Sequence, residues 1–205
     1  MLDKIKNIFK PIKLIVFLGV DGSGKTTLIN KLKKESPVFQ SRLYLGWNNY
    51  FFKWIGRLNK RTDYSSKKIL NLVNRISFFT FHLLLPFDFF VRYLRARLQA
   101  KHGIIISDRY PLPKKNFGIY RKLSLQLTYF LLPKPFLVFI LTGEPKEIWK
   151  RKKEGNYEKF LAEFERVNNA KNIFKCKTII VSTDCPIEKS FNNIFQELSK
   201  KLKII

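Results

Sequence analysis

Residues 19–27 combine glycines, a lysine and two threonines in a spacing that suits the binding of phosphate groups. All four fixed positions of the pattern G-x-x-x-x-G-K-[ST] are matched. The residues of this segment are Gly19, Val20, Asp21, Gly22, Ser23, Gly24, Lys25, Thr26 and Thr27. The glycines let the backbone curl so that successive N–H groups point at phosphate oxygens. Lys25 would then reach the β and γ phosphates of ATP, and the Thr26 hydroxyl would bind Mg²⁺.

A second candidate group, Asp108-Arg109-Tyr110, directly follows the branched run at residues 103–107. A carboxylate at Asp108 could hold Mg²⁺ opposite Thr26, directly or through water. The fork-shaped guanidinium of Arg109 suits an acceptor phosphate or the migrating phosphoryl group. A strand-end Asp and Arg that pair with each other for structural reasons are the alternative.

These motifs need strands and helices that bring them together. We expect strands over residues 12–18, 103–107, 136–141 and 178–181, and a weaker one over 42–45. We expect helices over residues 26–35, 65–85, 87–101, 146–153, 157–169 and 187–202, and a loop over 111–118. Such alternation builds a parallel sheet with helices on both faces, with ligands beyond the carboxyl ends of the strands. The prediction is an α/β fold in a single domain over residues 1–205.

The composition indicates a packed globule with anionic partners. Hydrophobic residues make up 45% of the chain, and 40 Lys and Arg against 15 Asp and Glu leave a formal charge of +25. This charge favours nucleotides, nucleic acid or an acidic membrane surface, although a solvated, compositionally biased surface would look the same. Cys176 and Cys185 are the two cysteines, and they indicate neither a disulfide framework nor a zinc site. We expect a reducing, cytoplasmic location without a signal peptide, because charges interrupt residues 1–13.

The most apolar stretch, residues 76–91, contains His82, Pro86 and Asp88. It is shorter than the ~20 apolar residues that span a bilayer. We expect a buried helix here, with peripheral membrane contact as the alternative.

Three segments, in this order, resemble the thymidylate kinase family. They are the loop from Gly19 to Leu28, the Ser107-Asp108-Arg109-Tyr110 motif, and Leu132-Pro133-Lys134-Pro135 before a strand that leads to Glu144-Pro145 and a basic helix with Arg151. The resemblance implies the P-loop NTPase fold with a five-stranded parallel sheet, ATP with Mg²⁺, and a small basic lid at about residues 150–160. It also places adenine near Thr183-Asp184-Cys185. A monomer and a homodimer are both compatible with the sequence.

The resemblance assigns roles to individual residues. It implies that Asp21 faces the acceptor and that Arg109 holds the acceptor phosphate. It also implies that, because the P-loop has no arginine, the catalytic arginine comes from the lid. Arg151 is the candidate, since residues 150–155 form a basic cluster that ends at a glycine hinge. A solvated helix face is the alternative for this cluster.

The acceptor side departs from the family pattern. Gly46-Trp47-Asn48-Asn49 stands where an arginine beside a proline is usual, and the expected Tyr-Gln-Gly segment is absent. Arg92, Arg95 and Arg97 lie out of step with the family's helix arginine, and we take Arg92 as a substrate-binding candidate. The small anionic acceptor is therefore a nucleoside monophosphate or, as in a divergent branch of thymidylate kinase-like proteins associated with surface polysaccharide synthesis, a sugar or glycan.

Two non-kinase interpretations remain. The charge, together with the aromatic residues Trp47, Tyr50, Phe51, Phe52 and Trp54, could serve a nucleic-acid-associated P-loop protein. No recognisable nucleic-acid-binding module accompanies them, so we do not expect nucleic acid as a partner. A non-catalytic nucleotide-binding protein on a kinase scaffold is the other interpretation.

Overall fold

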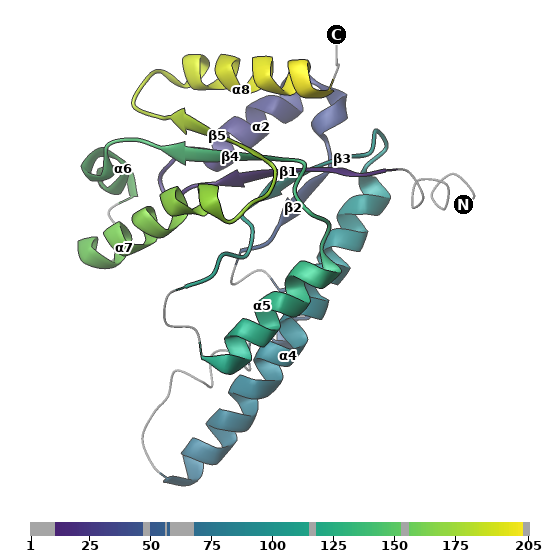
Figure 1. The fold of residues 1–205 in the computed structure, drawn as a ribbon, viewed down its shortest axis with the longest axis vertical. Helices are drawn as coiled ribbons and strands as arrows, with labels where there is room; N and C mark the ends of the chain where they lie inside the picture. Colours follow the sequence, from purple (N-terminus) through teal and green to yellow (C-terminus); the bar gives the residue numbers. More distant parts are fainter. Residues whose placement is uncertain are drawn as a thin grey trace.

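The computed structural model describes residues 11–46, 50–55, 57, 68–114, 118–152 and 156–202. In this part of the chain, five strands form one parallel sheet in the order β2-β3-β1-β4-β5 (Figure 1). The strands are β1 (Lys13–Leu18), β2 (Arg42–Tyr44), β3 (Ile104–Asp108), β4 (Leu137–Thr142) and β5 (Lys177–Ser182). The predicted α/β fold with a five-stranded parallel sheet is confirmed.

Helices cover both faces of the sheet because the strands bury side chains on both faces. On one face, Ile15 and Phe17 of β1 pack in a cluster with α2 (Lys25–Glu35) and α8 (Ile187–Leu202). On the other, Leu14 and Val16 pack in a cluster with α4 (Lys68–Gln99) and α7 (Tyr157–Asn168). This alternation is the period-2 arrangement of a strand that is buried on both sides.

The helix α4 corrects two expectations. It is one helix through Pro86, not two helices that meet there. Leu85 and Phe89 are both buried in the same core cluster, so packing continues across the proline and compensates for the missing N–H. The helix is also buried on one face only, since Ile76, Leu83 and Phe87 are exposed. No helix in the described ranges is long and apolar enough to cross a membrane.

The helix α5 (Ile119–Leu131) was not expected, and it packs along α4 (Figure 1). Residues 111–114 before it have no regular structure, in agreement with the predicted loop. The helix α6 (Pro145–Lys152) follows β4, and Asn156 caps α7 by accepting hydrogen bonds from the N–H groups of Glu158 and Lys159. Short 3-10 helices, η1 (Pro37–Phe39) and η2 (Asn169–Asn172), complete the described elements. Part of the predicted lid, residues 153–155, lies outside the described residues.

Candidate active site

The loop between β1 and α2 has the backbone geometry of a phosphate cradle. Gly22 and Gly24 have φ values of 89° and 82°, in the left-handed region that favours glycine. Gly24 is also the N-cap of α2, so the first turn of the helix opens directly from the loop. Within the described residues, the N–H groups of Gly22, Gly24 and Thr26 donate no backbone hydrogen bond. These groups and the positive end of the helix dipole are suited to anionic oxygens.

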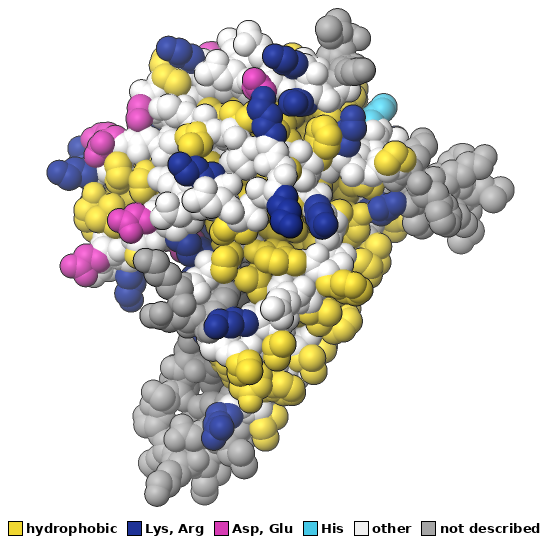
Figure 2. Space-filling model, viewed as in Figure 1, with side chains coloured by type: hydrophobic (Ala, Val, Ile, Leu, Met, Phe, Trp, Pro, Cys, Tyr) yellow, Lys and Arg dark blue, Asp and Glu magenta, His cyan; other side chains and the backbone are white. Residues whose placement is uncertain are grey.

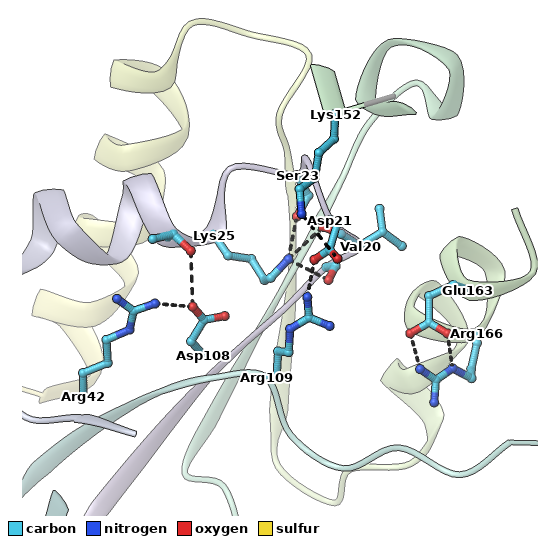
Figure 3. Close-up of polar contacts among 12 residues, drawn as sticks. Val20, Asp21, Ser23, Lys25, Arg42, Asp108, Arg109, Lys152, Glu163 and Arg166 are labelled. Atoms are coloured by element: carbon cyan, nitrogen blue, oxygen red, sulfur yellow. Dashed lines mark hydrogen bonds and ion pairs between the residues drawn. The ribbon is translucent and has the colours of Figure 1, made fainter. Parts of the chain in front are cut away.

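The Lys25 ammonium lies inside this loop and is held by the loop's own oxygens (Figure 3). Its Nζ donates to the carbonyl oxygens of Gly19 at 2.8 Å and Val20 at 2.7 Å. Burial, followed by the nearby Arg109 guanidinium, lowers the pKa of Lys25 to about 8. The lowered pKa means that this pocket disfavours the charge of Lys25, so an anionic ligand would relieve a real electrostatic cost.

Asp108 and Thr26 lie side by side, as predicted from their places in the sequence. The Thr26 Oγ1 donates to Oδ2 of Asp108 at 3.3 Å, and Asp108 is only 2% exposed. The Arg42 Nη2 lies 2.5 Å from the same Oδ2, because Arg42 belongs to the strand that neighbours β3. The other carboxylate oxygen, Oδ1, is buried and has no hydrogen-bond partner. A hydroxyl and a carboxylate with an unpartnered oxygen are hard ligands of the kind that Mg²⁺ prefers, so the residues present fit this cation.

The two residues expected on the acceptor side also meet. Arg109 forms an ion pair with Asp21 across the mouth of the loop (Figure 3). Arg109 has a φ of 77°, which is unusual for a residue with a side chain, and its carbonyl accepts a hydrogen bond from Ser107 Oγ at 2.7 Å. Such backbone strain persists where the surroundings hold it in place, and it is frequent at functional sites. The strained turn directs the guanidinium of Arg109 toward the P-loop.

The helix α6 packs directly on the P-loop. A Cβ at Gly22 would lie 2.6 Å from the carbonyl oxygen of Ile148, so this close approach requires glycine. Lys152 lies one turn beyond Ile148, and its Nζ is 3.8 Å from Oδ2 of Asp21. Lys152 is therefore the cation of α6 that faces the P-loop.

Arg151 lies on another side of α6. Its Nη2 donates to the carbonyl oxygen of Thr183 at 3.1 Å, in the segment expected to lie near adenine. The next residue, Asp184, accepts a hydrogen bond from the N–H of Glu144 at 2.8 Å, which ties this loop to the start of α6. The structure thus places Arg151 on the predicted adenine side and not at the P-loop.

A cavity of about 300 Å³ extends from the P-loop between α4, α5 and α7. Gly19 and Arg109 line it at the P-loop end. Its other lining residues include His82, Leu85 and Phe89 from α4, Arg121 and Ser124 from α5, and Glu163 and Arg166 from α7. An acceptor in this cavity would lie between the P-loop and three helices, next to Arg109.

The far part of the cavity carries both charged and neutral polar groups. Burial, assisted by the nearby Arg121, lowers the pKa of His82 to about 4, so this imidazole is neutral at physiological pH. Glu163 and Arg166 form a two-bond ion pair, and Arg166 Nη1 also donates to the Leu112 carbonyl at 3.1 Å. The pair is held against the loop that follows β3, so its position in the cavity wall is defined.

Arg92, the substrate-binding candidate on α4, is engaged in a structural contact. Its Nε donates to Asp88 at 2.7 Å, and its Nη1 donates to the Tyr44 carbonyl at 2.9 Å. It is not among the residues that line the cavity. Arg92 therefore connects α4 to the end of β2, and the structure does not bring Arg92 together with Arg109. The altered segment Trp47-Asn48-Asn49 lies outside the described residues.

Sequence reasoning included Lys152 in the basic cluster but chose Arg151 from it, and it missed Arg42. The signal for Lys152 was helical spacing, because it lies four residues after the apolar Ile148 and so shares the face of α6 that contacts the P-loop. The signal for Arg42 was its place at the start of a strand next to the one that ends in Asp108, but only the sheet order shows that these strands are neighbours.

Comparisons with known proteins identify the fold. A scan against protein-family models finds no match, and no curated protein matches this sequence. Among solved structures, a thymidylate kinase from Ehrlichia chaffeensis is similar, with a TM-score of 0.54 and 16% identity over 92% of this chain and 100% of that one. At this level of identity the likeness concerns the fold, and it agrees with the sheet order and the loop described above. The chain therefore has a P-loop kinase-like α/β fold.

Proposed function

We propose that this chain is a kinase that transfers the γ-phosphate of ATP to a small anionic acceptor. The observation that carries this proposal is the contact of Asp108 with Thr26 at the mouth of the loop that holds Lys25. A P-loop lysine, a P-loop hydroxyl and a strand-end carboxylate are the groups that hold a nucleoside triphosphate with its cation. The neighbouring cavity supplies a separate place for an acceptor.

Each residue has a role in this proposal. Lys25 and the loop N–H groups bind the β and γ phosphates, and Thr26 with Asp108 would hold Mg²⁺. When bound, the cation neutralises charge on the phosphate oxygens. Asp21 and Arg109 form the wall between the two substrates, so either can contact the acceptor group that attacks phosphorus. A lid cation, Lys152 or Arg151, would approach the transferred group when the lid closes.

The first candidate acceptor is a nucleoside monophosphate, as in the thymidylate kinase-like proteins. Arg109 lines the cavity at the P-loop end, where it could hold the acceptor phosphate by two parallel hydrogen bonds. Phe89 and the neutral His82 in the cavity wall offer apolar and polar surface for a base. The small volume, about 300 Å³, is at the lower limit for ligand pockets and suits a small molecule.

A sugar or glycan is the second candidate, and the Glu163–Arg166 pair favours it. The Glu163 carboxylate accepts hydrogen bonds and the Arg166 guanidinium donates them, so together they can satisfy several hydroxyl groups of a sugar. Among the aromatic residues considered for nucleic acid, Phe52 packs against both Phe51 and Trp54, with ring centroids 5.0 and 6.2 Å away. Trp47 of that group lies outside the described residues.

An acceptor screen with labelled ATP tests the proposal. Thymidine monophosphate, other monophosphates, sugars and glycans are offered in turn, and labelled product is measured. For the accepted substrate, we expect Arg109→Ala to raise the acceptor KM at least about tenfold, since a charged hydrogen bond is lost, while the Kd for ATP stays within about twofold.

Arg95→Ala is the matched control, because Arg95 is an exposed arginine of α4 that does not line the cavity. Arg95→Ala should change neither the acceptor KM nor the Kd for ATP. Equal losses of acceptor and ATP binding in Arg109→Ala would contradict the role of Arg109. Absence of transfer to every acceptor, with ATP binding intact, would favour a non-catalytic nucleotide-binding protein.

A further inference from the structure

The helix α4 is apolar on two opposite faces. Its inner face, with Phe81, Leu85 and Phe89, is buried in the core. The opposite face carries large exposed side chains at helical spacing, and these are Ile76, Phe79, Leu83, Phe87, Leu94 and Leu98. A helix with large apolar side chains on two opposite faces is normally covered on both of them, so the outer face of α4 lacks a cover in the described chain.

The outer side of α5 continues this surface. Its exposed large residues are Ile119, Tyr120, Leu123 and Phe130, and Phe130 is 85% exposed. The rings of Phe79 and Tyr120 lie 5.3 Å apart, which joins the exposed residues of the two helices. Figure 2 shows hydrophobic side chains gathered along the edge formed by α4 and α5. We name these ten exposed residues the outer α4/α5 face.

The charges around this face are of one sign. Between positions 64 and 143, the sequence has only two acidic residues, Asp88 and Asp108, which are 0% and 2% exposed. Arg75, Lys122 and Lys134 are exposed cations of the same region. In Figure 2, the visible Asp and Glu side chains lie in the other part of the molecule, around α6, α7 and α8. The helices α4 and α5 therefore expose apolar side chains and cations, and their one acidic residue, Asp88, is buried.

This combination of apolar side chains and cations favours a lipid surface over a second copy of the chain as the partner. A second copy of the same face would bring cations against cations, because neither copy exposes an acidic residue in this region. An anionic lipid surface matches both properties, since acyl chains accept the aromatic and aliphatic side chains and headgroups attract Lys and Arg. We propose that the outer α4/α5 face docks on an anionic membrane surface, with both helices lying along it.

Docking in this way has a geometric consequence for the active site. The inner sides of the same helices line the acceptor cavity, through His82 and Phe89 of α4 and Ser124 of α5. A membrane on the outer face would therefore lie one helix thickness from the cavity, about 10 Å. The inference concerns this surface alone and stands whichever acceptor the cavity takes.

Vesicle co-sedimentation of the full chain tests the docking. Vesicles of phosphatidylcholine are compared with vesicles that also contain about 30% phosphatidylserine, at about 0.1 M salt. We expect at least about tenfold tighter binding to the anionic vesicles, and a marked loss of that binding at about 0.5 M salt because the charges are screened. Absence of binding to both vesicle types would overturn the proposal, and so would equal binding to both.

Paired variants locate the surface. Phe130→Ser should weaken binding to anionic vesicles at least about tenfold, because an inserted aromatic side chain is lost. Ile180→Ser is its control, since Ile180 is 54% exposed on β5, away from the outer α4/α5 face. Lys122→Ala should weaken binding about fivefold, against no change for Lys189→Ala on α8.

Each variant is first checked by circular dichroism and its melting temperature, so that only folded variants are compared. Equal effects of Phe130→Ser and Ile180→Ser would overturn the location of the surface. Sedimentation velocity addresses the competing partner. A dimer that Phe130→Ser abolishes, in a protein that binds no vesicles, would assign the face to a second copy and refute membrane docking.

Discussion

The Lys25 ammonium should make ATP binding depend on pH in a way that the structure predicts. Burial, with Arg109 nearby, lowers the pKa of Lys25 from 10.5 to about 8 in the ligand-free protein. A bound triphosphate brings negative charge to the ammonium and raises this pKa again. Over the range above pH 8, the complex therefore binds more protons than its separate components. It follows that ATP binding takes up a proton there and weakens as the pH rises.

The magnitude follows from the pKa of about 8. About half of the ligand-free protein has a neutral Lys25 at pH 8, and about nine tenths at pH 9, so uptake should rise from about 0.5 to about 0.9 proton per ATP. The affinity should fall about tenfold between pH 7 and pH 9. His82 does not add to this uptake, because its pKa is about 4, and with a pKa of about 6 the γ-phosphate is almost fully ionised at pH 8 and above.

Isothermal titration calorimetry in two buffers of different ionisation enthalpy measures this uptake. Lys25→Arg is the control, since its guanidinium stays charged throughout the range and should abolish both the uptake and the decline in affinity. The reasoning is refuted if the wild-type protein takes up no proton at pH 9, or if Lys25→Arg takes up as much as the wild type.

Two further substitutions test the remaining parts of the site. Asp108→Asn should reduce the enhancement of ATP binding by Mg²⁺ at least about tenfold, because an ionised ligand is replaced by a neutral one. Titrations of ATP with and without Mg²⁺ measure this enhancement. An unchanged enhancement would exclude Asp108 as a ligand of the cation. Lys152→Ala should lower kcat about tenfold or more, because Lys152 faces Asp21. Arg151→Ala should mainly raise the KM for ATP, because Arg151 contacts the Thr183 carbonyl. Steady-state kinetics separate these effects, and the reverse pattern would assign the lid cation to Arg151.

Much of the sheet and of the nucleotide side could be predicted from local patterns. The apolar runs located the five strands to within about a residue or two at each end. Asp108 could be placed near Thr26 because both follow strands of one parallel sheet, whose carboxyl ends meet at the same edge. These predictions depend on the order of residues along single elements and on one general rule about parallel sheets.

The remaining features depend on contacts between elements. Helix α5 is an exception, because its apolar residues recur at helical period at least as clearly as those of α2 and α4, so its sequence could have predicted it. Helix α4 continues through Pro86 because the core accepts side chains on both sides of it. The choice between Lys152 and Arg151 depends on which face of α6 packs on Gly22; the spacing of Lys152 from the apolar Ile148 indicates the buried face, but only the fold shows that this face meets the P-loop.

The most direct measurement is the rate of phosphoryl transfer from ATP to the accepted substrate by the wild-type protein and by Lys25→Ala. Loss of this charge contact to the transition state should lower turnover at least about a hundredfold, or roughly 3 kcal/mol. Lys31→Ala, a substitution on the same helix at a lysine that pairs with Glu188, should leave turnover unchanged. Turnover that survives in Lys25→Ala at the wild-type rate would contradict a kinase that works through this loop.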